Sequence, residues 1–188
     1  MRLPSKKTTI IIGALITCLL VSGIAFAYMF RRSSEMKNEF VLGNVDCIVI
    51  EPKDTTASGE TQKTSITVKN TGNTEAYLRV RLVSYWVQEK DGATEIVAKP
   101  SVMPEFSVGD GWLKGDNDTF YYKKPVDSNS PNRVTGNLLK SPLILSQEGG
   151  YKQVVEVFAE AIQSMPTEAV IDSWSVSLDN NRNIVTVK

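Results

Sequence analysis

The chain has 188 residues, of which 41% are hydrophobic and 22% charged, an ordinary globular composition that excludes a disordered chain. Its 21 basic and 21 acidic residues cancel, so no net field attracts nucleic acid. The absence of histidine excludes an HExxH zinc site and a Ser-His-Asp triad, and we expect a protein that is not an enzyme and holds no cofactor.

The N-terminus is typical of an export segment. Basic residues precede an uncharged run, 10–30, and a pair of arginines follows it. Within the run, Ala25 and Ala27 give the small-x-small pattern of signal peptidase sites, which predicts cleavage before Tyr28 and a signal peptide over 1–27. The alternative is an uncleaved anchor helix that extends to about residue 30, since such a run is long enough to span a bilayer.

Either interpretation sends the rest of the chain out of the cell. Residues 31–38 are polar, and the segment 28–39 is expected to act as a tether or as a donor segment, with 40–188 as the folded domain. Cys18 lies inside the apolar run, and Cys47 is alone in the mature chain, so no disulfide can form within that chain.

The domain shows the short alternating runs of a β protein. The clearest run has Ala76, Leu78, Val80 and Leu82 on one face and arginines on the other, and beyond it the alternation blurs, which indicates a bulge or burial on both faces. The sequence Asn-Thr-Gly-Asn at 70–73 predicts a hairpin turn before it. Strands are predicted at 40–51, 62–69, 76–82, 96–97, 120–122 and 143–145.

The C-terminal part is less regular. Residues 151–165 fit both a helix and a strand, and the preceding glycine pair and the β-branched residues favour a strand. Residues 166–174 predict a short helix, and 184–187 a last strand or a frayed tail. The predicted fold class is all-β, a jelly-roll-like β-sandwich with one or two short helices after the N-terminal signal or transmembrane helix.

One carboxylate cluster is a candidate metal site. Asp110, Asp116 and Asp118 lie on a glycine-rich stretch, and carboxylate oxygens are the ligands that calcium prefers. Their spacing is not that of an EF-hand, and the alternative is a solvated turn. Carboxylates alone could also serve a glycoside hydrolase, so an extracellular hydrolase stays open as the least favoured function.

Five pieces of sequence carry a family resemblance. They are AFAYMF at the end of the export segment, NEFVLGNVDCIVIEP at 38–52, SITVKNTGNTEAYLRVRL at 65–82, Trp112 followed by FYYKKP, and VVEVFAEAIQSM followed by Trp174. In this order they resemble the TasA/camelysin-like proteins, which Gram-positive bacteria export through a dedicated signal peptidase. The resemblance implies a jelly-roll fold and favours a strand for 151–165. Because the chain lacks histidine, the protease activity attached to the camelysin name is not carried over.

The resemblance also implies a function. It predicts a secreted structural protein of the cell surface or biofilm matrix, a fibre subunit or its accessory, whose partners are itself or related subunits. Assembly in that family adds the N-terminal segment of one subunit to a sheet of the next, and here that segment would include Phe40, Val41 and Leu42. The alternative is a monomeric surface binding module that an uncleaved helix holds in the membrane.

Overall fold

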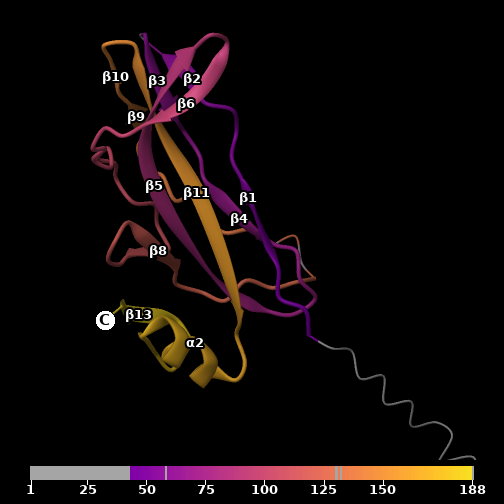
Figure 1. The fold of residues 1–188 in the computed structure, drawn as a ribbon. Helices are drawn as coiled ribbons and strands as arrows, with labels where there is room; N and C mark the ends of the chain where they lie inside the picture. Colours follow the sequence, from indigo (N-terminus) through magenta and orange to yellow (C-terminus); the bar gives the residue numbers. More distant parts are fainter. Residues whose placement is uncertain (1–42, 58, 130, 132, 188) are drawn as a thin grey trace, which may run out of the picture. The chain divides into compact units, whose positions relative to one another are not determined.

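The computed structural model describes residues 43–57, 59–129, 131 and 133–187, and within them the fold is mostly antiparallel β-sheet with one short helix (Figure 1). The predicted cleavage site at Ala25, Ala27 and Tyr28 and the predicted assembly segment at Phe40, Val41 and Leu42 lie outside the described residues. No helix in the described part is long and apolar enough to cross a membrane. The elements are β1 (Cys47–Ile50), β2 (Thr55–Ala57), β3 (Glu60–Lys63), β4 (Thr67–Asn70), β5 (Ala76–Lys90), β6 (Ala93–Val97), β7 (Trp112–Lys114), β8 (Thr119–Tyr122), β9 (Leu143–Leu145), β10 (Gln147–Glu148), β11 (Tyr151–Gln163), α2 (Thr167–Trp174), β12 (Val176–Leu178) and β13 (Ile184–Val187).

Two long strands form the centre of the largest sheet. β5 and β11 pair antiparallel without a register shift, from Ala76 opposite Gln163 to Gln88 opposite Tyr151. The strand order is β10-β11-β5-β8-β7, and β6 pairs with the second half of β5. The prediction of a strand for 151–165 is confirmed, and β5 continues well past residue 82 with no bulge at its β11 pairing.

The alternation predicted for 76–82 decides which face of this sheet meets the core. Leu78, Val80 and Leu82 are buried in the main cluster, while Arg79 and Arg81 lie on the other face, called here the outer face. Both Trp86 and Val87 are buried, so burial on two faces explains the blurred pattern there. The main cluster is closed by residues of β4, β8, β9 and the 126–139 connection, among them Ile66, Val68, Phe120, Leu138, Leu143 and Leu145.

The predicted strand at 62–69 is wrong in one respect. It divides into β3, which pairs with β2 and β9, and β4, which pairs with β1. Lys63 ends β3 in a buried position, where its ammonium group contacts Glu51 at 3.2 Å and Asp54 at 3.0 Å. The division lets the chain change sheets between 63 and 67.

The predicted hairpin of 65–82 is also wrong, because β4 and β5 do not pair with each other. The turn residues bind elsewhere: the buried Asn70 amide donates to the carbonyls of Thr74 and Val126, and its side-chain oxygen accepts from Gly72 N–H. Thr71 N–H donates to Asp46 O at 2.9 Å. The Asn-Thr-Gly-Asn stretch therefore joins two sheets and anchors the start of β1.

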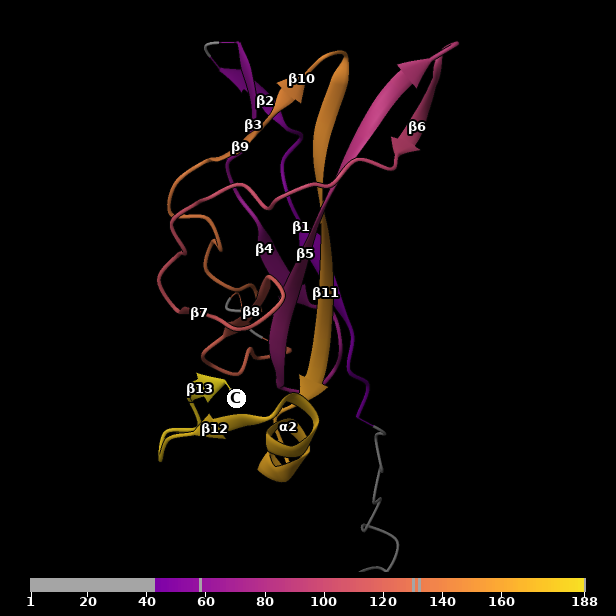
Figure 2. The same ribbon diagram turned by 60° about the vertical axis from the view of Figure 1, so that its left-hand side comes forward.

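The C-terminal elements cover one end of the outer face. The predicted helix of 166–174 is confirmed as α2, and the predicted last strand as β13, which pairs with β12. Val170 and Trp174 of α2 pack with Tyr77 and Tyr121 in a second buried cluster. Figures 1 and 2 show α2 at the end of β11, next to β12 and β13.

Candidate assembly edge

The second edge of β11 has no strand partner over most of its length. β11 pairs with β5 along one side, whereas on the other side β10 pairs only with Tyr151 and Lys152. Beyond Lys152, no strand among the described residues pairs with this edge. β1 is also half-paired, because β4 is its only strand partner in the described part of the chain.

Two hydrogen bonds fix the direction of the β11 backbone groups. Gln153 N–H donates to Ser146 O on the β10 side at 2.9 Å, and Ser164 N–H donates to Glu75 O on the β5 side at 3.0 Å. Since backbone groups alternate along a strand, the odd-numbered residues between them point their N–H and C=O groups at the open edge. These residues are Val155, Val157, Ala159 and Ala161.

The backbone groups of β1 alternate in the same way. Asp46 O accepts from Thr71 on the β4 side, so the backbone groups of Cys47 and Val49 point away from β4. β1 runs next to β11, with Cα atoms of the two strands within 8 Å of each other (Figure 2). No backbone hydrogen bond joins the two strands among the described residues. Two unpaired edges therefore lie side by side.

The side chains of β1 are divided between core and solvent. Cys47 and Val49 pack against the main cluster beside Val157, Ala159 and Ala161 of β11. Burial raises the pKa of the Cys47 thiol to about 11, and the nearby carboxylates of Asp46 and Glu160 add to the increase. A thiol with so high a pKa is a poor nucleophile at neutral pH.

Ile48 and Ile50 lie on the opposite side of β1 and are 47% and 42% exposed. On the neighbouring strand, Phe158 is 47% exposed on the outer face. The open edge is thus bordered by apolar side chains on its solvent side as well as on its core side, which is unusual for an edge in contact with water.

The three aspartates of the candidate calcium site do not converge. Asp118 lies 4.0 Å from the Lys114 ammonium group, and Asp110 lies 3.4 Å from that of Lys140. Asp116 contributes its backbone carbonyl to a turn, where it accepts from Thr119 N–H. In the described part of the chain no three acidic or cysteine side chains gather as a metal site would need.

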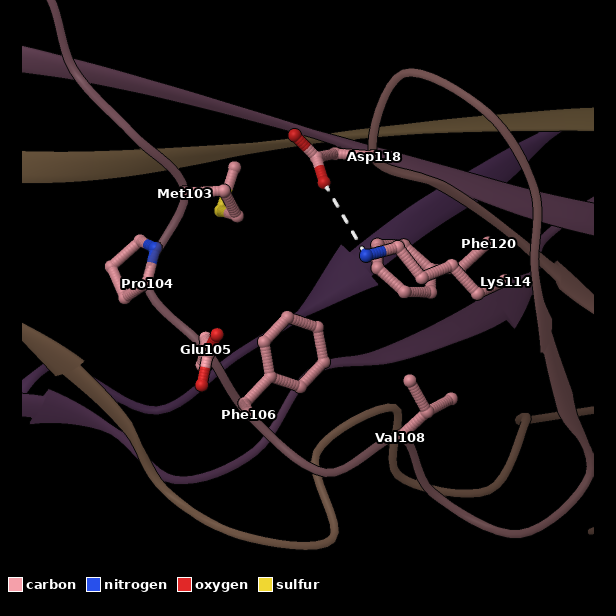
Figure 3. A pocket seen from close by; sticks show the side chains of 8 residues that line it. All are labelled: Met103, Pro104, Glu105, Phe106, Val108, Lys114, Asp118 and Phe120. Atoms are coloured by element: carbon pink, nitrogen blue, oxygen red, sulfur yellow. Dashed lines mark ion pairs between the residues drawn. The ribbon is translucent and has the colours of Figure 1, made fainter.

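Asp118 and Lys114 also line a pocket of about 320 Å³ (Figure 3). Its other walls are mainly apolar and come from the 103–108 loop and β8. The ion pair lies at one side, across from the side chains of Met103 and Phe106.

A second hollow, of about 690 Å³, lies on the outer face of the large sheet. Its apolar lining comes from Val83 and Tyr85 of β5, Ile96 of β6 and Phe158 of β11, and we call it the outer groove. This groove is not among the sites predicted from the sequence. The available signal was the change at the odd positions of β5 from arginine at 79 and 81 to apolar residues at 83 and 85.

Comparison of the chain with models of known protein families, with curated proteins and with solved structures found no match.

Proposed function

We propose that the protein is an exported structural protein of the cell surface or biofilm matrix, a fibre subunit or its accessory, and that its subunits assemble by β-augmentation. We further propose that its antiparallel sheets form a jelly-roll-like β-sandwich of the TasA/camelysin-like kind. The observation that carries the proposal is the open edge of β11 beside the open edge of β1. An unpaired edge is a template for another strand, and main-chain hydrogen bonds supply the affinity.

The predicted assembly segment has the chemistry that this edge needs. In an extended segment Phe40 and Leu42 point to one side and Val41 to the other. A strand added between β1 and β11 would meet the main cluster on one side and the exposed isoleucines of β1 and Phe158 on the other. A segment that is apolar at three successive positions suits both sides.

Addition of a strand requires β1 to move. Two strands that flank a third lie roughly 9.5 Å apart, because neighbouring strands are separated by about 4.8 Å. The present approach of β1 to β11, within 8 Å, is closer than that. β1 has four residues and one strand partner, so its displacement breaks no pairing with β11. In this proposal the short β1 yields and the long β11 stays in place.

The proposal is tested with proline substitutions at neighbouring positions of β11. Ala159→Pro removes an N–H that points at the open edge, a place where strands tolerate proline, and we expect the protein to fold but to form no fibres. Glu160→Pro is the matched control: it removes an N–H directed at β5 and should unfold the protein. Circular dichroism shows whether each variant is folded, and sedimentation with electron microscopy shows whether it forms fibres.

Deletion of residues 28–42 gives an independent test from the donor side. The proposal requires that the shortened protein forms no fibres and that N-terminal sequencing of the native protein begins at Tyr28. Fibres formed by the Ala159→Pro protein, or a wild-type protein that remains monomeric at high concentration, would contradict the proposal.

A further inference from the structure

The outer face of the large sheet is covered at one end and bare at the other. An ion pair marks the boundary: the Arg79 guanidinium contacts Glu160 at 2.6 Å and lies over the Trp174 ring at 4.8 Å. On one side of this pair, α2 and the β12–β13 hairpin bury the face. On the other side lies the outer groove, where Phe158 and Ile96 are 47% and 74% exposed.

Two charged side chains flank this groove without a partner. Arg81 of β5 and Glu156 of β11 are both exposed and form no ion pair or side-chain hydrogen bond with the rest of the described chain. The register places Arg81 opposite Phe158 and Glu156 opposite Val83, so the two charges lie on a diagonal across the apolar residues. The surface thus presents one charge of each sign on diagonal positions, with the apolar residues Val83 and Phe158 on the other two positions of the same two pairs.

We propose that a second copy of this chain docks on the outer groove, face to face, through a two-fold contact. In such a contact Arg81 of one copy meets Glu156 of the other, and the two-fold symmetry repeats this pair with the two copies exchanged. A partner with a single sign of charge would pair with one of these residues and repel the other. A second copy carries one charge of each sign in matching positions and so pairs both.

The shape of the surface agrees with this occupant. The groove is lined by residues of three neighbouring strands, β6, β5 and β11. The order of these strands in the sheet can be followed in Figure 2. Two sheet faces pack about 10 Å apart with interdigitating side chains, and the half-buried ring of Tyr85 and the exposed ring of Phe158 can supply that contact. The contact uses the face of β11 and the proposed fibre contact uses its edge, and Phe158 takes part in both.

The test is a charge swap in the native protein, isolated from cells that express the full chain. Arg81→Glu and Glu156→Arg, made singly, place like charges opposite each other and should weaken dimerisation by at least about tenfold in Kd. The double variant restores the pairing with reversed signs and should restore dimerisation. Glu105→Arg, also an exposed acid but outside the groove, is the matched control and should change nothing.

Sedimentation velocity is measured in an Ala161→Pro background. Ala161 also points its N–H at the open edge but does not line the outer groove, so association through the face is measured separately from association through the edge. Dimers that the single reversals weaken and the double variant restores support the proposal, whether or not the wild-type protein forms fibres. A monomer at all concentrations would overturn it, as would single variants that dimerise like the parent. A double variant that stays as weak as the single ones would also overturn it, because the occupant would then not be a second copy in this orientation.

Discussion

The reactivity of Cys47 reports directly on how β1 lies against β11. Burial is the main cause that raises the pKa of this thiol to about 11, and Asp46 and Glu160 contribute less. At pH 8 the thiolate fraction is then about 0.1%, compared with about 9% for a thiol at the ordinary value of 9.0. The more basic thiolate is intrinsically more nucleophilic by roughly eightfold, so the net expectation is a reaction about tenfold slower than in the unfolded chain.

The assay follows the reaction of Cys47 with an aromatic disulfide reagent from pH 7 to 11, with the labelled peptide identified by mass spectrometry. The same chain in urea supplies the unfolded reference. Glu160→Gln should lower the midpoint of the pH profile only slightly, because burial outweighs the charge of Glu160. A folded chain that reacts as fast as the unfolded one, with a midpoint near 9, would show that β1 does not pack against β11.

Two further predictions concern the C-terminal cover of the outer face. Trp174→Ala should lower the free energy of unfolding by about 3–5 kcal/mol, because this ring is buried. Ile171→Ala, on the exposed side of the same helix, should lower it by only about 1 kcal/mol. Equal losses for the two variants in urea denaturation would contradict the packing of α2. Hydrogen bonds from Asn183 hold the pKa of the Asp179 carboxyl below its ordinary value of 3.8. Their contribution to the stability of the fold is therefore fully present above about pH 3.8, and it is lost as the pH falls through the pKa that Asp179 has in the folded chain. Asn183→Ala should raise that pKa in an NMR titration, and an unchanged pKa would count against this turn.

The individual strands could be predicted from the sequence far better than their pairing. β5 and α2 follow local patterns, because large apolar residues at period two and a short apolar helical run need no distant partner to be recognised. The sequence Asp91-Gly92 is typical of a two-residue hairpin turn, and the structure has such a turn between β5 and β6 with positive φ at both residues, although the hairpin was not predicted. Because β6 begins directly after this turn, it covers 93–97 and is longer than the predicted strand at 96–97.

Pairing depends on contacts that the local sequence does not contain. The stretch at 70–73 has the composition of a hairpin turn, yet Asn70 is buried and binds the carbonyl of Val126, 56 residues along the chain. The open edge of β11 could not be predicted for the same reason, since an edge is defined by strands that are not its neighbours in sequence. The outer groove stays open because α2 covers the outer face of the sheet only as far as the Arg79–Glu160 ion pair.

Amide hydrogen exchange of β11 tests the central claim most directly, because added strands protect the backbone groups they bind. In fibres, the N–H groups of Val155, Val157, Ala159 and Ala161 should exchange at least about tenfold more slowly than in the monomer. The N–H of Phe158, which the alternation directs at β5, should be protected in both states. Equal exchange of the four odd-numbered amides in fibres and monomer would show that assembly does not use this edge.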